Sequence, residues 1–206
     1  MIKAILFDFD GVIVDSEKIH MQTFNEILSL HVPENRWYQE FAGTGSRKII
    51  VKLMKEHSME GDAGELVEKR RELFRQYLDR IKPLPGMKEF LQSTSQKKAI
   101  VSGGHRSYIE ALLDMMDIRK FFGFILSAED TPYRKPDPKP FLIAAEALGV
   151  KPEECLVIED SYSGCQGARA AGMRLVWVRP HPSMSPPDCD LVVEDFTDPK
   201  LTDILN

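Results

Sequence analysis

The stretch Lys3–Val12 constrains the fold of this chain more than any other part of the sequence. It begins as a short apolar run with β-branched and aromatic residues, which is typical of a strand buried on both faces. Two aspartates, Asp8 and Asp10, follow where such a strand should end, and Gly11 comes directly after them. Parallel α/β sheets bind their ligands at this end of their strands, so the two carboxylates mark a candidate site.

The spacing of the two aspartates has a consequence for their charge. Side chains two positions apart on a strand point to the same face, and like charges that close need a cation or a shared proton to hold them. An ordinary strand-to-turn junction would contain the same residue types, because Asp and Gly favour turns. The rest of the chain has to decide between a ligand site and a turn.

Length and composition are ordinary for a soluble globular protein. The 206 residues suit one sizeable domain or a core with a smaller insert, and the net charge of −5 does not favour nucleic-acid binding. No window is long and apolar enough to span a membrane, and the N-terminus leaves no room for a signal peptide. The three cysteines (Cys155, Cys165 and Cys189) form no CxxC pair. We therefore expect reduced thiols and a cytoplasmic protein.

Residues 16–82 have the apolar spacing of helices and no strand pattern. We predict a first helix from about Ser16 to Leu28, in a segment closed by Pro33. A second predicted helix is capped by Ser46, and a third runs from about Ala63 to Ile81.

Beyond residue 83 the pattern alternates between strands and helices. The predicted strands are 98–101, 123–127, 155–158, 175–178 and an edge strand at 191–193, with helices ending at 93 and spanning 107–115, 138–148 and 161–171. Such alternation indicates a parallel sheet with helices on both faces. The sequence therefore predicts an α/β fold: a Rossmann-like doubly wound parallel sheet from residues 1–15 and 83–206, with residues 16–82 inserted as an α-helical domain.

Three further segments bring polar residues to the ends of these strands or to the loops after them. Ser102 and Gly103 offer a hydroxyl and open backbone amides just before a helix, which suits an anion. Lys135 lies in a proline-stiffened loop, and Glu159 and Asp160 end another strand. Taken singly, the serine and the aspartate could be helix caps and the lysine a solvated charge. Together they bring acids, a hydroxyl and a cation to one edge of one sheet.

These motifs, in this order, resemble the four signatures of the haloacid dehalogenase-like hydrolase superfamily. The segments Asp10–His20 and Glu159–Gly172 further resemble the branch that holds β-phosphoglucomutase and sugar-phosphate phosphatases, in which a helical cap follows the first signature. One departure lies after Ser102, where many relatives carry a second hydroxyl residue and this chain has Gly103-Gly104-His105. The resemblance covers nearly the whole chain.

The resemblance implies a role for each residue of the set. Asp8 would be the nucleophile that forms an aspartyl-phosphate, and Asp10 the general acid and then base. Mg²⁺ would be held by the Asp8 carboxylate, the Asp10 backbone carbonyl and Asp160, with Glu159 binding directly or through water. Three groups would hold the transferring phosphate: Ser102, the Gly103 amide and Lys135.

Substrate choice is expected to lie in the helical cap. His20 matches a histidine near the hinge in the mutase branch, although a lone histidine is more often a surface or packing residue. Arg47 follows a Gly-rich loop and is our prediction for an arginine that reaches the substrate. For each of the three arginines, Arg47, Arg70 and Arg71, the default expectation is a solvated helix face. The linkers near 14–16 and 82–85 would form a hinge.

Three functions are consistent with this sequence. The first is a Mg²⁺-dependent phosphatase of a small phosphorylated metabolite, acting as a monomer. The second is a phosphomutase that moves phosphate between two positions of one sugar, and the third is a non-catalytic binding protein with the same fold. Dehalogenation is disfavoured, because it needs no acid for the leaving group and Asp10 is present.

Overall fold

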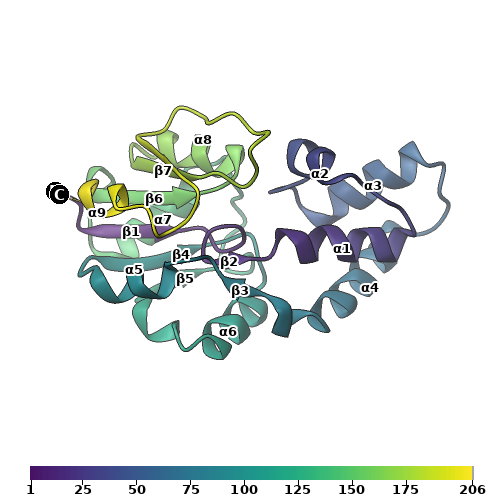
Figure 1. Cartoon of the computed structure of the whole chain (residues 1–206), viewed down its shortest axis with the longest axis horizontal. Coiled ribbons are helices and arrows are strands. Elements are labelled where there is room, and N and C mark those ends of the chain that lie inside the picture. Colours follow the sequence, from purple (N-terminus) through teal and green to yellow (C-terminus); the bar gives the residue numbers. More distant parts are fainter. Residues whose placement is uncertain (206) are drawn as a thin grey trace. The chain divides into compact units, whose positions relative to one another are not determined.

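A computed structural model of the chain describes residues 1–205. The chain forms two compact units (Figure 1). One contains Met1–Asp15 together with the chain from Pro83 onward, and the other is Ser16–Lys82. We call them the core unit and the helical unit. Among the described residues, no helix has the length and apolar character needed to cross a membrane.

A six-stranded parallel sheet organises the core unit. Its order is β5-β4-β1-β6-β7-β8, formed by β1 (Ala4–Phe7), β4 (Lys97–Val101), β5 (Phe124–Leu126), β6 (Cys155–Glu159), β7 (Arg174–Val178) and β8 (Leu191–Val193). Strand β1 pairs in parallel with β4 on one side and β6 on the other, and its four residues are all buried. The predicted strand, buried on both faces, is confirmed.

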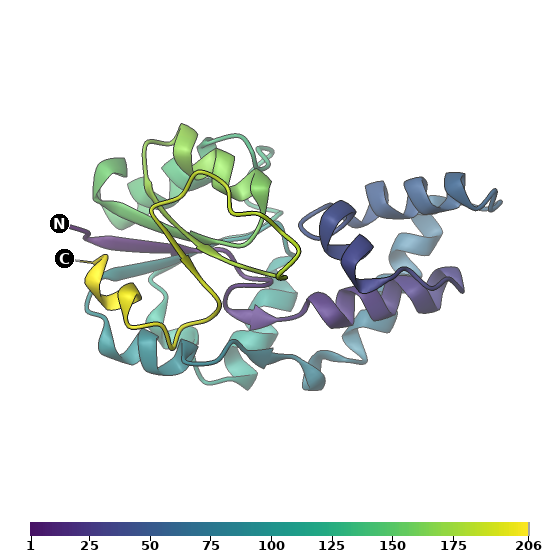
Figure 2. The ribbon, with the colours of Figure 1, turned by 45° about the horizontal axis from the view of Figure 1, so that its top comes forward.

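Helices cover both faces of this sheet, as Figures 1 and 2 show. Helices α5 (Met87–Ser93) and α6 (Arg106–Met115) lie against one face, and α7 (Lys139–Leu148) and α8 (Tyr162–Ala170) against the other. Three short elements complete the unit: η2 (Arg119–Phe121), η3 (Pro152–Glu154) and α9 (Lys200–Asp203). The prediction of an α/β Rossmann-like fold with helices on both faces is confirmed.

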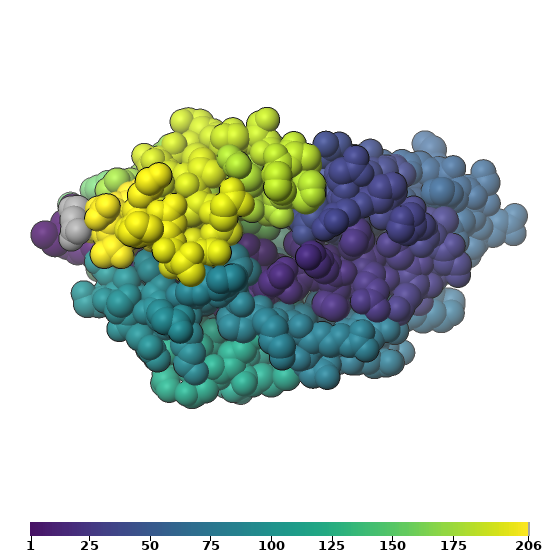
Figure 3. Space-filling view, viewed as in Figure 1, coloured from purple at the N-terminus to yellow at the C-terminus, as the bar shows by residue number. Residues whose placement is uncertain are grey.

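Aromatic packing fixes β1 against its surroundings. The Phe7 ring lies 6.3 Å from the ring of Phe90, 5.8 Å from that of Phe122 and 6.3 Å from that of Phe196. The last of these comes from the segment after β8, which Figure 3 shows in yellow beside the teal of α5. The amide of Phe196 also donates to the carbonyl of Pro85 at 3.0 Å. Aromatic rings from three segments therefore pack around Phe7, the last residue of β1, directly before Asp8.

The helical unit contains α1 (Glu17–Leu28), α2 (Glu34–Glu40), α3 (Ser46–Glu56), α4 (Ala63–Arg75) and η1 (Leu78–Arg80). Helix α2 was not predicted, because it has seven residues of which only Trp37 and Tyr38 are buried. The third predicted helix was too long, since α4 ends at Arg75. Ser46 is the first residue of α3, and Gly45 holds the cap position that we predicted for the serine.

Two short strands, β2 (Val14–Asp15) and β3 (Lys82–Pro83), pair with each other in a separate sheet. They lie at the two places where the chain passes between the core unit and the helical unit. Neither was predicted, because each has only two residues, too few for an alternating pattern.

Candidate active site

The loop after β1 carries the first two candidate residues. The amide of Asp8 donates to the carbonyl of Ile158 at 2.9 Å, so the pairing of β1 with β6 continues through the first aspartate. The chain then turns back, because the carbonyl of Phe9 accepts from the amides of Ile13 and Val14 at 2.9 and 3.1 Å. Backbone hydrogen bonds thus fix both carboxyl-bearing residues at the end of the central strand.

Two glycines permit the close approach of the acids on β6. A Cβ atom on Gly11, whose φ is +73°, would lie 2.0 Å from Oδ2 of Asp160. A Cβ atom on Gly164 would lie 1.8 Å from Oε1 of Glu159. Real side chains do not tolerate such distances, so any larger residue would displace an acid. The interpretation that Gly11 allows a close approach is confirmed.

Lys135 lies between two carboxylates at this edge of the sheet. Its Nζ is 2.9 Å from Oδ1 of Asp8 and 2.5 Å from Oε1 of Glu159. The Lys135 side chain is only 14% exposed, that of Asp8 13% and that of Glu159 0%. The sequence predicted these three residues in one site, and the structure brings them into contact.

Burial and neighbouring charge set the protonation of this cluster. Burial raises the pKa of Asp8 to about 7, while the Lys135 ammonium acts in the opposite direction. Burial alone would lower the pKa of Lys135, but the carboxylates of Asp8 and Glu159 hold it above its ordinary value. The lysine therefore remains a fixed cation beside the predicted nucleophile.

Both oxygens of Glu159 are held by hydrogen bonds. Oε1 accepts from Lys135, and Oε2 accepts from the Asp160 amide at 3.0 Å and from the amide and hydroxyl of Ser161, both at 2.9 Å. Ser161 caps α8 by accepting from the Gly164 amide at 3.0 Å. Glu159 is thus an anchor for the loop that presents Asp160 and for the ammonium of Lys135.

Three carboxylates could hold a divalent cation. One oxygen each from Asp8, Glu159 and Asp160 lie within 4.8 Å of one another. Hard carboxylate oxygens are the donors that Mg²⁺ prefers, so the residues present fit that ion. The carboxylate of Asp10, the fourth predicted acid, is not in this group.

Ser102 lies at the same edge, one strand away. The register pairs Phe7 with Ile100, so the residues after β1 and those after β4 are neighbours. The Ser102 amide donates to the carbonyl of Leu126, and its hydroxyl accepts from the Gly104 amide, both at 2.9 Å. Gly103 is exposed, and a Cβ atom there would meet nothing within 4 Å. In this loop the backbone of Gly103 is therefore exposed, and the Ser102 hydroxyl beside it already makes one hydrogen bond.

Tyr108 is a site residue that sequence reasoning missed. Its hydroxyl donates to Oδ1 of Asp10 at 2.5 Å. The two residues are 98 positions apart. The available signal was the prediction that a helix starts near residue 107, because the first turn of such a helix lies at the same edge of the sheet as the strand end before it.

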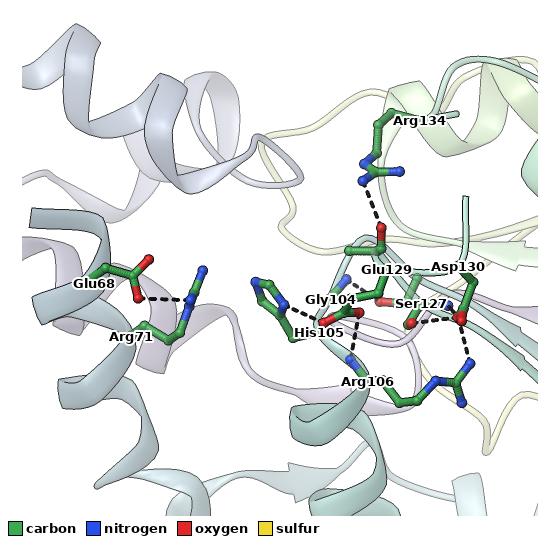
Figure 4. A network of polar contacts seen from close by, with 11 residues as sticks. Glu68, Arg71, Gly104, His105, Arg106, Ser127, Glu129, Asp130 and Arg134 are labelled. Atoms are coloured by element: carbon green, nitrogen blue, oxygen red, sulfur yellow. Dashed lines mark hydrogen bonds and ion pairs between the residues drawn. The ribbon is translucent and has the colours of Figure 1, made fainter. Parts of the chain in front are cut away.

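A polar network joins the loop after β4 to the loop after β5 (Figure 4). The Nδ1 atom of His105 lies 2.6 Å from Oε1 of Glu129. Arg106 is the first residue of α6. Its Nη2 atom lies 2.6 Å from Oδ2 of Asp130 and donates to the carbonyl of Ile125 at 3.0 Å. Asp130 also accepts from the amide and the hydroxyl of Ser127, at 2.7 and 2.6 Å. These bonds fix the start of α6 relative to two strand ends.

In the helical unit, Arg70 is only 7% exposed. It donates to Oγ1 of Thr23 at 3.2 Å and to Oγ of Ser46 at 3.0 Å, and it makes a short contact with Nδ1 of His20. The expectation of a solvated position for Arg70 is therefore wrong. The His20 ring stacks on Phe74 with centroids 4.4 Å apart. The structure brings His20 together with Arg70, which was not predicted.

The other two arginines considered for substrate binding, Arg47 and Arg71, lie at the surface of the helical unit. Arg47 is exposed, and its Nη1 lies near Gly64 in the first turn of α4. Arg71 pairs with Glu68 on its own helix at 2.9 Å, with its side chain 37% exposed (Figure 4). The roles suggested for His20 and Arg47 in substrate binding stay predictions.

Comparison with known proteins identifies a family whose sequence model matches this chain. The model of the haloacid dehalogenase-like hydrolase family matches residues 5–178, which is most of the chain. The fructose-1-phosphate phosphatase YqaB of Escherichia coli is 32% identical over 181 residues, covering 85% of this chain and 96% of that protein. A phosphorylated carbohydrates phosphatase of Thermotoga maritima is 27% identical over 184 residues, covering 85% of this chain and 84% of that protein.

Solved structures agree with the fold. A conserved haloacid dehalogenase-like protein from Agrobacterium tumefaciens has a TM-score of 0.86 and 28% sequence identity. The match covers 99% of this chain and 98% of that chain. The likeness therefore includes both the core unit and the helical unit.

Proposed function

The chain belongs to the haloacid dehalogenase-like hydrolase family, and from this premise we propose that it is a Mg²⁺-dependent phosphatase of small phosphorylated sugars. The observation that carries the proposal is the contact of Asp8 with Lys135 at 2.9 Å, beside the acids that end β6. A carboxylate fixed at a strand end next to a permanent cation suits attack on a phosphoryl group. The names of the two phosphatase relatives support a phosphorylated sugar as the substrate.

The first half-reaction uses both aspartates. A carboxylate oxygen of Asp8 attacks phosphorus, and the bond from phosphorus to the sugar oxygen breaks with its electron pair going to that oxygen. Protonated Asp10 gives its proton to the departing oxygen, so the sugar leaves as an alcohol. The products of this step are the free sugar and an aspartyl-phosphate on Asp8.

The second half-reaction releases phosphate. Asp10, now a carboxylate, takes a proton from a water molecule whose oxygen attacks phosphorus. The bond from phosphorus to the Asp8 oxygen breaks, its electron pair returns to the carboxylate, and inorganic phosphate leaves. Both aspartates are then back in their starting protonation states.

Lys135, Ser102 and the Gly103 amide are proposed to hold the phosphoryl oxygens in both steps. The pKa of Lys135 stays above its ordinary value because of the carboxylates beside it, so its charge persists at neutral pH. Ser102 is 8% exposed at the end of β4, and the backbone of Gly103 is open. A fixed cation and fixed donors stabilise charge that builds up on the phosphoryl oxygens.

Mg²⁺ is the proposed cofactor. Asp8 and Asp160 would hold it through their carboxylates and Asp10 through its backbone carbonyl, while Glu159 is already bonded through both oxygens. The ion, when bound, neutralises phosphoryl charge that the single lysine leaves unbalanced. We also propose that the helical unit acts as a cap domain that selects the substrate, because it is inserted directly after the first signature.

We further propose that the protein works as a monomer in the cytoplasm. The cysteines support this compartment, because all three are free thiols in the described structure. Size-exclusion chromatography with light scattering tests the monomer, and fractionation of cells with a tagged chain tests the location.

The proposal is tested by phosphate release over a panel of small sugar phosphates, with and without Mg²⁺. We expect release that stops with a chelator and returns with the metal. No phosphate release from any member of the panel would contradict the proposal.

The phosphomutase alternative shares the same core residues, so it needs its own arm of the experiment. A glucose 1-phosphate anomer with a trace of the 1,6-bisphosphate is supplied, and free phosphate and glucose 6-phosphate are followed together. We expect phosphate to exceed isomerised product. Glucose 6-phosphate that forms faster than phosphate, and that collapses in Arg47→Ala, would favour the mutase.

A further inference from the structure

We propose that Tyr108 is a positioning residue that holds the Asp10 carboxylate in place for both proton transfers. The inference rests on the proposed function and adds a residue to it that none of the family signatures contains. Its first observation is the hydrogen bond from the Tyr108 hydroxyl to Oδ1 of Asp10, at 2.5 Å. Hydrogen bonds to charged groups are shorter and stronger than those between neutral groups.

The Tyr108 ring is held by packing on two sides. It lies edge-on to the ring of Phe9, with centroids 5.5 Å apart and planes at 90°. Phe9 is fully buried between the two aspartates of the loop after β1. On another side, a Cβ atom on Gly104 would lie 3.4 Å from Cδ1 of Tyr108 and 3.2 Å from Oγ of Ser102. The backbone of Gly104 therefore lies beside both the Tyr108 ring and the Ser102 hydroxyl.

The start of α6 fixes the backbone of Tyr108. Its amide donates to the carbonyl of His105 at 3.1 Å, in the first turn of the helix. Two residues earlier, Arg106 is bonded to Asp130 and to the carbonyl of Ile125 (Figure 4). The hydroxyl of Tyr108 is therefore placed by a braced helix and by packed rings, and its position does not depend on a flexible side chain.

This placement assigns separate tasks to the two oxygens of Asp10. Oδ1 accepts from the phenol, and the proton exchanged with the sugar oxygen and then with water is carried on Oδ2. Tyr108 keeps its own proton in both half-reactions. Its contribution is orientation: a carboxylate that rotates away from the reacting atoms loses much of the advantage of an acid in contact.

The test is Tyr108→Phe, which removes the hydroxyl and keeps the ring against Phe9. With fructose 1-phosphate we expect kcat to fall by about tenfold to a hundredfold, which is the range for losing one hydrogen bond to a charged group. We expect KM to change by less than about twofold, because the phosphate-binding residues are untouched. In a single turnover of p-nitrophenyl phosphate, nitrophenolate release should change by less than about twofold, since this leaving group departs without a proton.

A matched control is Tyr77→Phe in the helical unit. Its hydroxyl also donates to a carboxylate, that of Glu26, at 3.0 and 3.1 Å. We expect this variant to keep the wild-type kcat. In the Asp10→Asn background, Tyr108→Phe should cause no further loss, because the carboxylate that it positions is absent.

Three outcomes would overturn the inference. The first is a kcat for Tyr108→Phe within about twofold of the wild type in an enzyme that Asp10→Asn inactivates; this leaves the proposed function intact. The second is an equal loss with both substrates that adds to the loss in Asp10→Asn, since this indicates a structural role only. The third is a wild type that releases no phosphate from either compound, which overturns the proposed function and this inference together.

Discussion

The sheet edge and the interior of the helical unit both bury a basic side chain, but they hold it differently. At the edge, Lys135 lies between the carboxylates of Asp8 and Glu159, which strand ends and glycines bring together. In the helical unit, Arg70 is held by the hydroxyls of Thr23 and Ser46, by His20 and by the faces of two phenylalanine rings.

The two buried charges, on Lys135 and on Arg70, have different roles. At the edge, opposite charges are crowded together, and burial works against the charged form of Asp8. Such a cluster suits a ligand that changes the balance of charge. In the helical unit the guanidinium joins three helices, α1, α3 and α4, so its contacts stabilise the fold. Substitutions at the edge should therefore affect chemistry first, and those around Arg70 should affect stability first.

The largest expected effect is that of Asp8→Asn on turnover. We expect phosphate release to fall at least about a thousandfold, because the amide cannot form the acyl-phosphate. The free energy of unfolding at pH 8 should be unchanged or higher. The pKa of Asp8 is about 7 in the folded chain against 3.8 in the unfolded one, so its charge costs stability as the pH rises from 3.8 towards 7.

Denaturation at pH 5 and pH 8 tests the stability part. The stability difference between the wild type and Asp8→Asn should be smaller at pH 5 than at pH 8, because the cost of charging Asp8 grows as the pH rises from 3.8 towards 7. Asp188→Asn is the matched control, because that side chain is 95% exposed and should affect neither property. A turnover for Asp8→Asn near that of the wild type would remove the nucleophile from the mechanism.

The second prediction separates the two acids that end β6. Asp160→Asn should raise the Mg²⁺ concentration for half-maximal activity by about a hundredfold, and Glu159→Gln by no more than about tenfold. Glu159→Gln should instead lower the free energy of unfolding by about 3 kcal/mol, because it breaks a buried ion pair. The reason is that both oxygens of Glu159 are already bonded within the chain.

Metal titrations of phosphate release and metal-free denaturation measure these two effects. If Glu159→Gln raises the Mg²⁺ requirement more than Asp160→Asn does, the glutamate is a direct ligand and its anchoring role is wrong. The two variants also test whether activity and stability depend on different residues of the same sheet edge.

The sequence predicted the sheet edge better than the helical unit for a physical reason. A buried parallel strand that ends in Asp-Phe-Asp-Gly is a local pattern, and the carboxyl ends of parallel strands necessarily meet at one edge. Asp8, Lys135 and Glu159 could therefore be placed together without knowing any side-chain conformation. The strands and the α/β fold followed from the same alternation of apolar runs and helices.

What could not be predicted depends on contacts between distant segments. The bond from Tyr108 to Asp10 depends on the rotation of α6, which no local pattern states. The sequence pattern around Arg70 is the same as for an exposed arginine on a helix, so it does not indicate that Arg70 is buried. Helix α2 was missed because most of its residues are polar and only two of its seven residues are buried.

The third prediction tests the helical unit directly. Arg70→Ala should lower the free energy of unfolding by about 3 kcal/mol, because it leaves buried polar partners unsatisfied. Arg47→Ala should change it by less than about 0.5 kcal/mol, since that side chain is exposed. Urea denaturation followed by far-ultraviolet circular dichroism measures both. Equal losses in the two variants would show that the buried position of Arg70 does not add to the stability of the fold.

The smallest expected effect is that of the exposed pair formed by His105 and Glu129. Burial alone would raise the pKa of Glu129, but hydrogen bonds from His105 and from the Arg106 amide hold it at about 2. Since this value is below the 4.5 of the unfolded chain, the pair stabilises the fold above pH 4.5, and this contribution is lost as the pH falls towards 2. Both side chains are about half exposed, 48% and 49%, so solvent screening limits the effect.

We therefore expect Glu129→Gln to cost less than about 1 kcal/mol at pH 7, with the difference from the wild type shrinking at low pH and at high salt. Glu68→Gln is the matched control in the helical unit, because Glu68 likewise has an exposed basic partner, Arg71 at 2.9 Å. Its cost should be smaller still, since that pair links residues on one helix while Glu129 joins two loops of the core unit. Thermal unfolding at pH 7 and pH 3, at low and high salt, measures both. A loss in Glu129→Gln that is independent of pH and salt would mean that the side chain acts by packing, and that charge at the sheet edge matters only where it is buried.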